Sequence, residues 1–464
     1  MTPWVADVLV PRVLRSAIYP AWAIKERSPY LRIAAERKKE ETLSRDERMD
    51  LAFARMQDIA AYANRHVPFY RDRFRAAGVS PLDLKSPADL DRFPILTKQD
   101  IRDQGERLIS EEYPPDSLVR KRTSGSTGVS LHVLADPDCM QFRRGITLYR
   151  DRWTGWNMGE PRAMVWGNPP PRPGLRGRLR RALLEREFFL DTLRMNEATL
   201  DAFALEVLKR RPTLLFGHAH SLYLFARFWR QRGHPSYRPR GIISTAMVLH
   251  PHERREIESV FNTRIFDRYG CEEVSLIASE CGAHQGLHVN TDGVWVEILD
   301  DPEHPGLPGR VIVTDLMNRG MPLLRYEVGD RARVLDRSCP CGRSYPLLED
   351  VAGRIADYLI TPDGEYVSGI SLTENFATLI PGVEQVQVIQ ESRDRLVLNL
   401  VPAPAFNDES RRRIATLVLE RFGPGMRHDI VFQDRISPEP SGKYRFAINR
   451  VAESPRKSPA PIGQ

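Results

Sequence analysis

Residues 213–245 read TLLFGHAHSLYLFARFWRQRGHPSYRPRGIIST. Two short apolar runs, at 213–217 and 241–245, enclose a stretch at 221–233 whose apolar residues recur at helical spacing. The same alternation extends upstream. Residues 130–135 and 162–166 are further β-like runs, and residues 198–211 form a further helical stretch. Apolar strands that alternate with helices favour an α/β body built around a buried, layered sheet.

The first 110 residues carry helical patterns instead. Residues 46–78 place apolar side chains at helical spacing, break between Val67 and Pro68, and end at Gly78. This pattern predicts a helix, a turn and a second helix. Thr97 precedes KQDIRD and is expected to cap a further helix. We therefore expect residues 1–110 to form a helical part of the large domain.

Two later regions have β-like patterns of different kinds. Runs within 286–336 alternate at period two with turn residues between them, which predicts an antiparallel meander or a small β-barrel. Beyond residue 353 the patterns predict a hairpin, two strands and a helix at 359–367, 383–390, 394–402 and 409–423. We expect a large α/β domain at 1–353 and a small mobile α+β domain at 354–453, joined to it by a hinge. A disordered tail is expected at 454–464.

The composition is that of a soluble globular protein, with 464 residues of which 41% are hydrophobic and 28% charged. The 68 basic and 61 acidic residues leave a net charge of +7, and no array of stacking aromatic residues supports nucleic-acid binding. The basic excess gathers in one loop, which is either a solvated surface or a contact for an anionic substrate or membrane, at Arg172, Arg176, Arg178, Arg180 and Arg181.

The sequence has no candidate for a membrane-spanning helix, because no stretch approaches the roughly 18 consecutive apolar residues that such a helix needs. Asp7, Pro11, Arg12 and Arg15 interrupt the start of the chain, and no signal peptide is recognisable. We therefore expect a cytoplasmic protein. The first 35 residues would form either a helix packed on the body or a weak amphipathic contact with a membrane surface.

A loop rich in serine, threonine and glycine, RTSGSTG at 122–128, precedes the β-like run at 130–135. Glycines let the backbone bend closely around a ligand, and successive N–H groups and hydroxyls can donate hydrogen bonds to phosphate oxygens. This is not a Walker loop, because the Lys-Ser/Thr pair that enters a helix is missing. Taken alone, the loop is either a plain turn or a phosphate-binding site.

The chain has five cysteines, and an odd number in a long chain without a secretory signal argues against a disulfide framework. Three thiolates and one imidazole form a closed tetrahedral set that suits structural Zn²⁺. The proposed ligands are Cys281, His288, Cys339 and Cys341. His284 is an alternative to His288, Cys271 is expected to be a packed thiol, and scattered reduced cysteines are the alternative to a metal site.

Five segments resemble, in the same order, the motifs of adenylate-forming enzymes: TSGSTG at 123–128, YGCEE at 269–273, RYEVGD at 325–330, GR at 353–354 and SGK at 441–443. Within that superfamily, YANRHVPFYRDRF, FPILTKQDIR and the CPCG at 339–342 resemble the phenylacetate–coenzyme A ligase branch. That branch includes capsule-biosynthesis relatives and enzymes that adenylylate a deazaflavin coenzyme. The resemblance covers nearly the whole chain.

The resemblance implies a nucleotide-binding role for each matched segment. The phosphates of ATP would be held by Thr123, Ser124, Gly125, Ser126, Thr127 and Gly128. Ser244, Thr245 and Ala246 would form the adenine-side loop, although relatives often have Gly-Glu at positions 246 and 247. Tyr269 and Gly270 would lie near the adenine. Asp330 would accept hydrogen bonds from both ribose hydroxyls.

Three residues would be catalytic by the same resemblance. Glu273 would coordinate Mg²⁺ bridging the phosphates, with the adjacent Glu272 as the alternative ligand. Arg354 would lie at the hinge, close to the ribose and phosphate. Lys443 would stabilise the charge that builds up between the carboxylate and the α-phosphate.

The implied activity is ATP-dependent adenylation of a carboxylic acid, with release of pyrophosphate, followed by acyl transfer to coenzyme A. The alternatives are an amide-forming ligase that uses an amine acceptor, a nucleotidyl-transferring ligase of the same fold, and a catalytically silent scaffold in polysaccharide biosynthesis. The acid stays open. Its pocket wall would include Phe216, His218, His220 and Ser221, or the two histidines would form a partly exposed pair at a helix start.

Overall fold

A computed structural model describes residues 9–123, 131–167, 174–175, 186–300, 308–352, 358–364, 366–368, 372, 376, 380–436 and 447–451. The chain divides into two compact units, whose boundary in the C-terminal part lies between residues 354 and 355. Within the described residues, no helix is long and apolar enough to cross a membrane.

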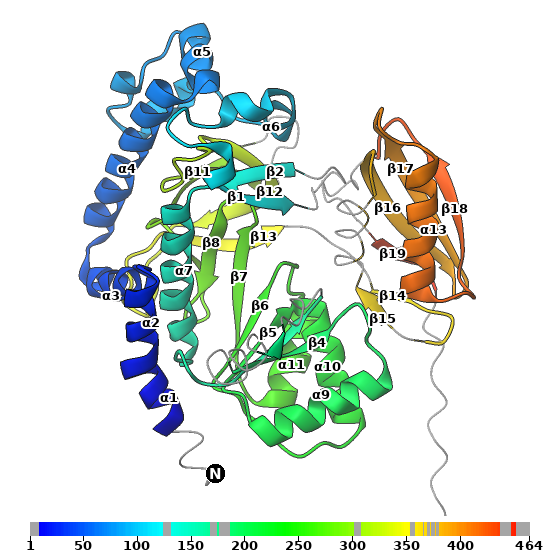
Figure 1. Cartoon of the computed structure of the whole chain (residues 1–464). Helices are drawn as coiled ribbons and strands as arrows, with labels where there is room; N and C mark the ends of the chain where they lie inside the picture. Colours follow the sequence, from blue (N-terminus) through cyan, green and yellow to red (C-terminus); the bar gives the residue numbers. More distant parts are fainter. Residues whose placement is uncertain are drawn as a thin grey trace, which may run out of the picture. The chain divides into compact units, whose positions relative to one another are not determined.

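Helices begin the first unit (Figure 1): α1 (Val10–Val13), the π-helical turn η2 (Leu14–Ile18), α2 (Tyr19–Lys25), α3 (Tyr30–Lys39), α4 (Arg45–His66), α5 (Pro68–Ala77) and α6 (Lys98–Gln104). Short 3₁₀ turns connect them: η3 (Glu40–Thr42), η4 (Pro81–Asp83), η5 (Pro87–Arg92), η6 (Gly105–Leu108) and η7 (Pro115–Ser117). The predicted helix–turn–helix is confirmed, since α4 ends before Pro68 and α5 closes on Gly78 at φ 65°. Thr97 caps α6 as predicted, accepting a hydrogen bond from the Asp100 backbone N–H.

An eleven-stranded sheet forms the centre of this unit, in the order β10-β11-β12-β13-β9-β8-β7-β6-β5-β3-β4. Its parallel half consists of β3 (Arg162–Trp166), β4 (Glu187–Asp191), β5 (Leu214–His218), β6 (Gly241–Thr245) and β7 (Ile265–Cys271). The helices α7 (Pro137–Asp151), α9 (Glu197–Arg210), α10 (Ala219–Gln231) and α11 (Pro251–Phe261) are interleaved with these strands, and η8 (Arg152–Thr154) follows α7. The predicted α/β class is therefore confirmed.

Both faces of the central parallel strands are covered, which explains why β5 and β6 carry apolar residues on both faces. Adjacent residues of a strand point to opposite faces. Ile243 packs in a cluster with Tyr30 of α3 and Leu148 of α7, while its neighbour Ile242 is fully buried on the other face. Strands that are buried on both sides lose the polar–apolar alternation of a half-exposed sheet.

The other half of the sheet is antiparallel. It consists of β8 (Ser275–Glu280), β9 (Leu287–Val289), β10 (Val294–Leu299), β11 (Gly309–Asp315), β12 (Tyr326–Leu335) and β13 (Leu347–Ala352). β10, β11, β12 and β13 pair in sequence order, which is the meander that the period-two pattern predicted. Their described residues continue into the main sheet through β9, so the closed small barrel that was the alternative is not confirmed.

One buried carboxylate joins the N-terminal helices to this body. The Asp292 carboxylate lies 3.4 Å from the Arg37 guanidinium of α3, 3.6 Å from Arg48 of α4 and 3.9 Å from Arg150 of α7. The Tyr345 hydroxyl donates to the same carboxylate at 2.9 Å. Because removing one partner from a buried charge cluster leaves the others uncompensated, this contact fixes the helical part on the sheet.

The second unit is a small α+β structure. β14 (Tyr358–Ile360) and β15 (Tyr366–Ser368) form the predicted hairpin. β16 (Val383–Ser392), β17 (Arg395–Pro402), β18 (Arg427–Phe432) and β19 (Ala447–Asn449) form a sheet in the order β18-β17-β16-β19. α13 (Asp408–Phe422) is the predicted helix, capped at its N-terminus by the Asn407 side chain.

Candidate active site

The parallel strands β3, β5, β6 and β7 end at one edge of the main sheet. In open α/β sheets, ligands bind outside the carboxyl ends of parallel strands. Several predicted site residues lie at this edge: Ser244 and Thr245 at the end of β6, Ala246 directly after it, and Tyr269 and Gly270 near the end of β7. The residues that the motifs selected are thus brought to a position suited to a ligand.

Two features mark the segment at the end of β6. Ser244 is fully buried, and its hydroxyl oxygen has no hydrogen-bond partner among the described residues. Ala246 has φ 65°, a left-handed conformation that favours glycine. Relatives often have glycine at this position. The backbone of Ala246 is therefore in a left-handed conformation that costs more free energy for alanine than for glycine.

The YGCEE segment turns tightly from β7 into β8. A Cβ atom at Gly270 would lie 2.5 Å from the carbonyl oxygen of Ser275, and Ser275 itself has φ 68°. Only glycine fits at position 270, because the two backbones approach too closely for a side chain. The turn presents Glu272 and Glu273.

The two adjacent glutamates have different environments. Glu273 is buried at 2% exposure, and its carboxylate accepts a hydrogen bond from the Tyr326 hydroxyl at 3.0 Å. The second oxygen of this carboxylate is buried without a partner among the described residues. Glu272 has a side chain that is 59% exposed and lies 3.5 Å from the Lys121 ammonium. Only Glu273 therefore offers an enclosed carboxylate oxygen that is available to a cation.

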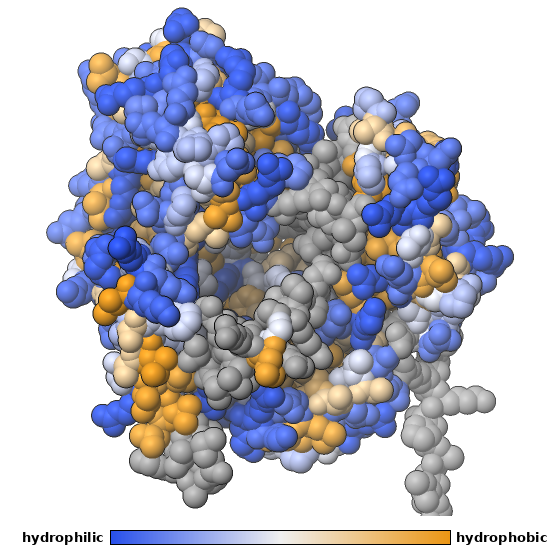
Figure 2. Space-filling model, in the orientation of Figure 1, coloured by the Kyte–Doolittle hydropathy of each residue, from blue (hydrophilic) through white to orange (hydrophobic). Residues whose placement is uncertain are grey.

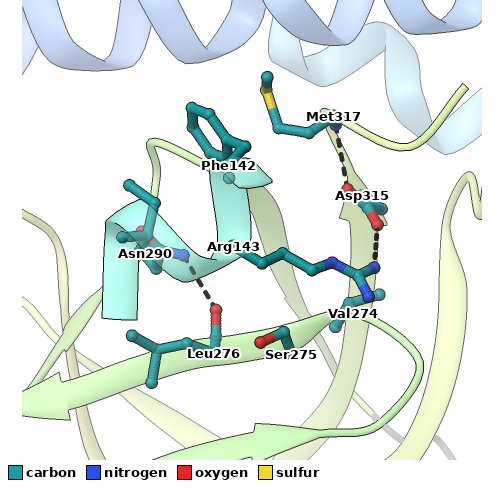
Figure 3. Close-up of a pocket in the computed structure, with 10 residues that line it drawn as sticks. Phe142, Arg143, Val274, Ser275, Leu276, Asn290, Asp315 and Met317 are labelled. Atoms are coloured by element: carbon teal, nitrogen blue, oxygen red, sulfur yellow. Dashed lines mark hydrogen bonds and ion pairs between the residues drawn. The ribbon is translucent and has the colours of Figure 1, made fainter. Parts of the chain in front are cut away.

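Arg143 supports the same turn from α7. Its guanidinium donates to the backbone carbonyl of Glu273 at 2.8 Å and to the Asp315 carboxylate at 2.6 Å. Figure 3 shows the side chain crossing from the helix towards Asp315 on β11. One buried guanidinium thus joins α7, the β7–β8 turn and β11.

This arginine also lines a small pocket with about 250 Å³ of empty space, part of which is open to solvent. Phe142 and Met317 lie around the pocket in Figure 3, with Leu276 and Asn290 on its opposite side. We assign no ligand to it.

Asp330 lies beside Tyr269, although their strands are far apart in the sheet. The Tyr269 hydroxyl donates to the Asp330 carboxylate at 2.9 Å, while β13, β9 and β8 separate β12 from β7 in the strand order. The sheet is therefore strongly curved. Tyr326 and Asp330 lie four residues apart on β12, in a stretch whose pairing with β11 is irregular. The motifs at 269–273 and 325–330 are therefore joined by two hydrogen bonds.

Burial sets the protonation of two other residues near this edge. His218 is 3% exposed at the end of β5, and its ring lies 4.0 Å from the Trp166 ring. Burial lowers the pKa of His218 to about 4, which makes the imidazole neutral at physiological pH. Burial, and secondly the Glu273 charge, raises the pKa of Cys271 well above its ordinary value. Cys271 is thus a protonated, packed thiol, as the sequence predicted.

The histidine pair at the start of α10 differs from the expected exposed pair. His218 is buried, while Nδ1 of His220 lies 2.5 Å from the Glu253 carboxylate of α11. The alternative of two partly exposed histidines is therefore wrong for His218.

The four candidate zinc ligands come together on the antiparallel half of the sheet. One donor atom from each of Cys281, His288, Cys339 and Cys341 lies within 4.8 Å of all the others. The Cys281 and Cys339 sulfurs are 3.6 Å apart, and the Cys341 sulfur is 3.5 Å from Nε2 of His288. Tetrahedral zinc with Zn–S bonds of about 2.3 Å places its sulfurs about 3.8 Å apart, so the donor set fits this metal.

Backbone N–H groups and arginines surround this cluster, while burial raises the pKa of the Cys281 thiol to about 12 and also raises that of Cys339. The backbone N–H groups of Ala283 and Arg343 point at the Cys281 and Cys341 sulfurs, at 3.4 and 3.5 Å. Three thiolates, one neutral histidine and Zn²⁺ carry a net charge of −1, and a set of cationic guanidiniums stands around it: Arg48, Arg150 and Arg343. Burial, and secondly these arginines, lowers the pKa of His288 to about 3, which keeps its imidazole neutral.

His284, the alternative ligand, lies elsewhere. Its Nδ1 is 3.2 Å from the Glu280 carboxylate, and its ring packs on Phe266 at 4.7 Å. The structure thus groups His288, and not His284, with the three cysteines.

Seven predicted site residues lie outside the described residues: Ser124, Gly125, Ser126, Thr127, Gly128, Arg354 and Lys443. Thr123 is the last residue of β1 (Val119–Thr123), which pairs antiparallel with β2 (Leu131–Ala135) through Thr123 and Leu131. The sequence did not select Arg143, Asp315 or Trp166. Tyr326 lies within a recognised motif, but it had no assigned role.

The fold is that of the adenylate-forming ligases. A solved structure of 2-hydroxyisobutyryl-CoA ligase with 2-HIB-AMP and CoA aligns with a TM-score of 0.60, at 20% identity, covering 89% of this chain and 92% of that chain. The same ligase in the postadenylation state with 2-HIB-AMP gives a TM-score of 0.57 at 21% identity, covering 89% of this chain and 91% of that chain.

Curated relatives narrow this class. Protein CapK of Staphylococcus aureus is 23% identical over 411 residues, covering 87% of this chain and 89% of that protein. The phenylacetate-coenzyme A ligase of Thermus thermophilus is 26% identical over 353 residues (69% and 73% covered), and that of Aromatoleum evansii is 25% identical over 447 residues (89% and 93%). The family model of the CapK C-terminal domain matches residues 359–450. Over most of its length the chain is thus similar to phenylacetate-CoA ligases and to CapK, and its fold is that of adenylate-forming ligases.

Proposed function

We propose that this protein activates a carboxylic acid with ATP and then transfers the acyl group to coenzyme A. One observation carries the proposal: Tyr269 bonds to Asp330, and Tyr326 bonds to Glu273, at the carboxyl edge of the parallel strands. Two motifs that are some fifty residues apart thereby form one polar site where α/β sheets bind nucleotides. The phenylacetate-CoA ligase relatives support the same reaction class.

In this proposal, the nucleotide lies across the ends of β6 and β7. Ser244, Thr245 and Ala246 would face the adenine together with Tyr269 and Gly270, and Asp330 would accept hydrogen bonds from the ribose. The loop 123–128 would hold the β- and γ-phosphates through N–H and hydroxyl donors. The buried, unpaired carboxylate oxygen of Glu273 supports its role as a Mg²⁺ ligand. When bound, Mg²⁺ neutralises phosphate charge during the transfer.

The chemistry would proceed in two steps. A carboxylate oxygen of the acid attacks the α-phosphorus of ATP. The bond between the α-phosphorus and the oxygen that bridges it to the β-phosphorus breaks, and pyrophosphate leaves with the electron pair of that bond. The thiolate of coenzyme A then attacks the acyl carbon, and AMP departs. Lys443 would stabilise the charge in the first step. The small domain at 354–453 would turn about the Arg354 hinge between the two steps.

We further propose that Cys281, His288, Cys339 and Cys341 hold a structural Zn²⁺. A closed shell of four protein ligands leaves no open position for substrate. The metal would therefore contribute to the stability of the β-rich part and not to the reaction.

The test is pyrophosphate exchange. The purified protein is incubated with Mg²⁺-ATP, labelled pyrophosphate and a panel of aryl, fatty and hydroxy acids. We expect exchange with one class of acid, and a loss on the order of 100-fold in Lys443→Ala, because a group that stabilises transition-state charge contributes about that much. Lys209→Ala removes an exposed lysine at the end of α9 and serves as the matched control.

Each negative result has a distinct meaning. Exchange that persists in Lys443→Ala would remove this lysine from the reaction. No exchange with any acid, in a protein that binds ATP, would favour the silent scaffold. Exchange followed by an amide product with amines, and no thioester with coenzyme A, would favour the amide-forming ligase.

A further inference from the structure

The first helical segment of the chain packs on the body with only one of its faces. α1, η2 and α2 continue from one into the next over residues 10–25. Leu14 and Ala23 are buried at 7% and 6% exposure. Gly159 allows this packing, because a Cβ atom there would lie 3.2 Å from the Pro11 carbonyl oxygen. The predicted helix on the body is therefore present.

The opposite side of this segment carries exposed apolar side chains, which we call the N-terminal apolar face: Leu9, Val13, Ile18 and Ile24, at 40%, 45%, 39% and 79% exposure. Ala17 and Ala21 are exposed between them. Figure 2 shows a corresponding apolar patch at the lower left, where α1 and α2 lie in Figure 1. Isolated exposed apolar residues are ordinary on a protein surface, but a contiguous group on one helical segment marks an interaction surface.

The charges along the same segment are almost all positive. Between residues 9 and 27 the exposed basic residues are Arg12, Arg15, Lys25 and Arg27, and the single acidic residue is Glu26. The chain as a whole has 68 basic and 61 acidic residues, so this local ratio departs from the average. Long basic side chains can keep their charges at the level of lipid phosphates while their stems lie along apolar surface.

We propose that the N-terminal apolar face docks this protein on an anionic lipid surface. A helix that lies in the membrane interface buries one apolar face at the boundary of the acyl chains and places basic residues against anionic headgroups. The face has both features. It does not require the proposed ligase activity, and it would hold the enzyme against a bilayer without crossing it.

Charge decides between a lipid surface and a second copy of the chain. Two copies meeting through this face would bring two sets of basic residues together, and like charges that face each other disfavour association. An anionic bilayer offers the complementary charge.

The experiment is co-sedimentation of the full-length protein with vesicles of phosphatidylcholine, alone or mixed with phosphatidylglycerol. We expect binding to the mixed vesicles that weakens as salt rises, because exposed charges are screened within about 10 Å at 0.1 M. Val13→Ser with Ile24→Ser should weaken binding at least about tenfold, since two apolar side chains would no longer be buried. Arg12→Gln with Arg15→Gln should weaken binding about tenfold on the mixed vesicles only.

The matched control is Leu82→Ser with Leu205→Ser, which changes two leucines that are 85% and 62% exposed on η4 and α9. All three double variants should melt at the wild-type temperature, because the replaced side chains are exposed. The proposal is overturned if the wild type ignores the mixed vesicles, or if the control weakens binding as much as Val13→Ser with Ile24→Ser. The proposal is also overturned if light scattering shows a wild-type dimer that Val13→Ser with Ile24→Ser abolishes and the control does not.

Discussion

At the scale of single residues, His218 is a buried titratable group at the carboxyl edge of the sheet whose pKa is strongly lowered. It is buried against Trp166 at the end of β5, and burial lowers its pKa from 6.5 to about 4. In the unfolded chain the His218 imidazole binds a proton near pH 6.5, whereas in the folded protein it binds one only near pH 4. The unfolding free energy is therefore unaffected by protonation of His218 above about pH 6.5, and it decreases as the pH falls from 6.5 towards 4.

His218→Gln should remove that pH dependence. Between pH 7 and pH 4, the wild type should lose about 3 kcal/mol more unfolding free energy than the variant, because one pKa unit corresponds to about 1.4 kcal/mol. Urea denaturation at several pH values measures the difference. Parallel pH curves for the two proteins would show that the His218 imidazole accepts its proton in the folded state.

Residue types within motifs could be selected from the sequence, whereas their supporting contacts could not. Glu273 and Asp330 stand in recognisable motifs, and the structure brings them beside Tyr326 and Tyr269. Arg143 has no motif. Arg143 supports the site through its hydrogen bond to the Glu273 carbonyl, which is 130 residues away in the chain. No local sequence pattern indicates such a contact.

At the scale of elements, α7 fixes the turn between β7 and β8 through Arg143. A guanidinium that bridges the Glu273 carbonyl and Asp315 should hold the Glu273 carboxylate in place for a cation. Residues that orient metal ligands typically change metal affinity 10- to 100-fold when they are replaced.

Arg143→Gln should therefore raise the Mg²⁺ concentration for half-maximal pyrophosphate exchange by about 10-fold or more. Arg254→Gln is the matched control, because Arg254 bridges the Ile265 carbonyl at 3.0 Å and the Glu280 carboxylate at 2.9 Å in the same way. Both variants should lose stability, but only Arg143→Gln should shift the Mg²⁺ dependence. An equal shift in both would reduce the role of Arg143 to general packing.

The elements themselves were largely predictable. Helices such as α4 and strands such as β6 follow from local periodicity, capping residues and proline positions. The strand order and curvature were not predictable, because the pairing of β13 with β9 joins segments about sixty residues apart. The choice between a meander and a closed barrel depends on such long-range pairs.

At the scale of the whole molecule, the cysteine–histidine cluster joins the turn after β8 and the strand β9 to the segment between β12 and β13. The sequence selected the four candidate ligands by type, but it left His284 and His288 as alternatives. The structure separates the two, since β9 places His288 opposite Leu347 while His284 pairs with Glu280.

We expect one zinc per chain by elemental analysis of protein purified without chelator. Cys339→Ser should lose the metal and lower the melting temperature by about 5 °C or more, since structural zinc contributes several kcal/mol to folding and 1 kcal/mol shifts large domains by about 2 to 4 °C. Cys139→Ser changes a buried cysteine outside the cluster and should keep the zinc. Protein that contains no zinc when purified without chelator, or that melts at the same temperature before and after chelation, would contradict the metal site.

The spacing of Tyr326 and Asp330 on β12 has a consequence for how this gene can vary. Both hydroxyl–carboxylate contacts depend on the path of the backbone between these residues, where β12 pairs irregularly with β11 and Gly329 has φ 91°. A one-residue slip there moves every later side chain of the strand to the other face. Single-codon insertions or deletions between these two positions should therefore be tolerated much less than substitutions there. Natural length variation is instead expected in the connections that lead into and out of the strand.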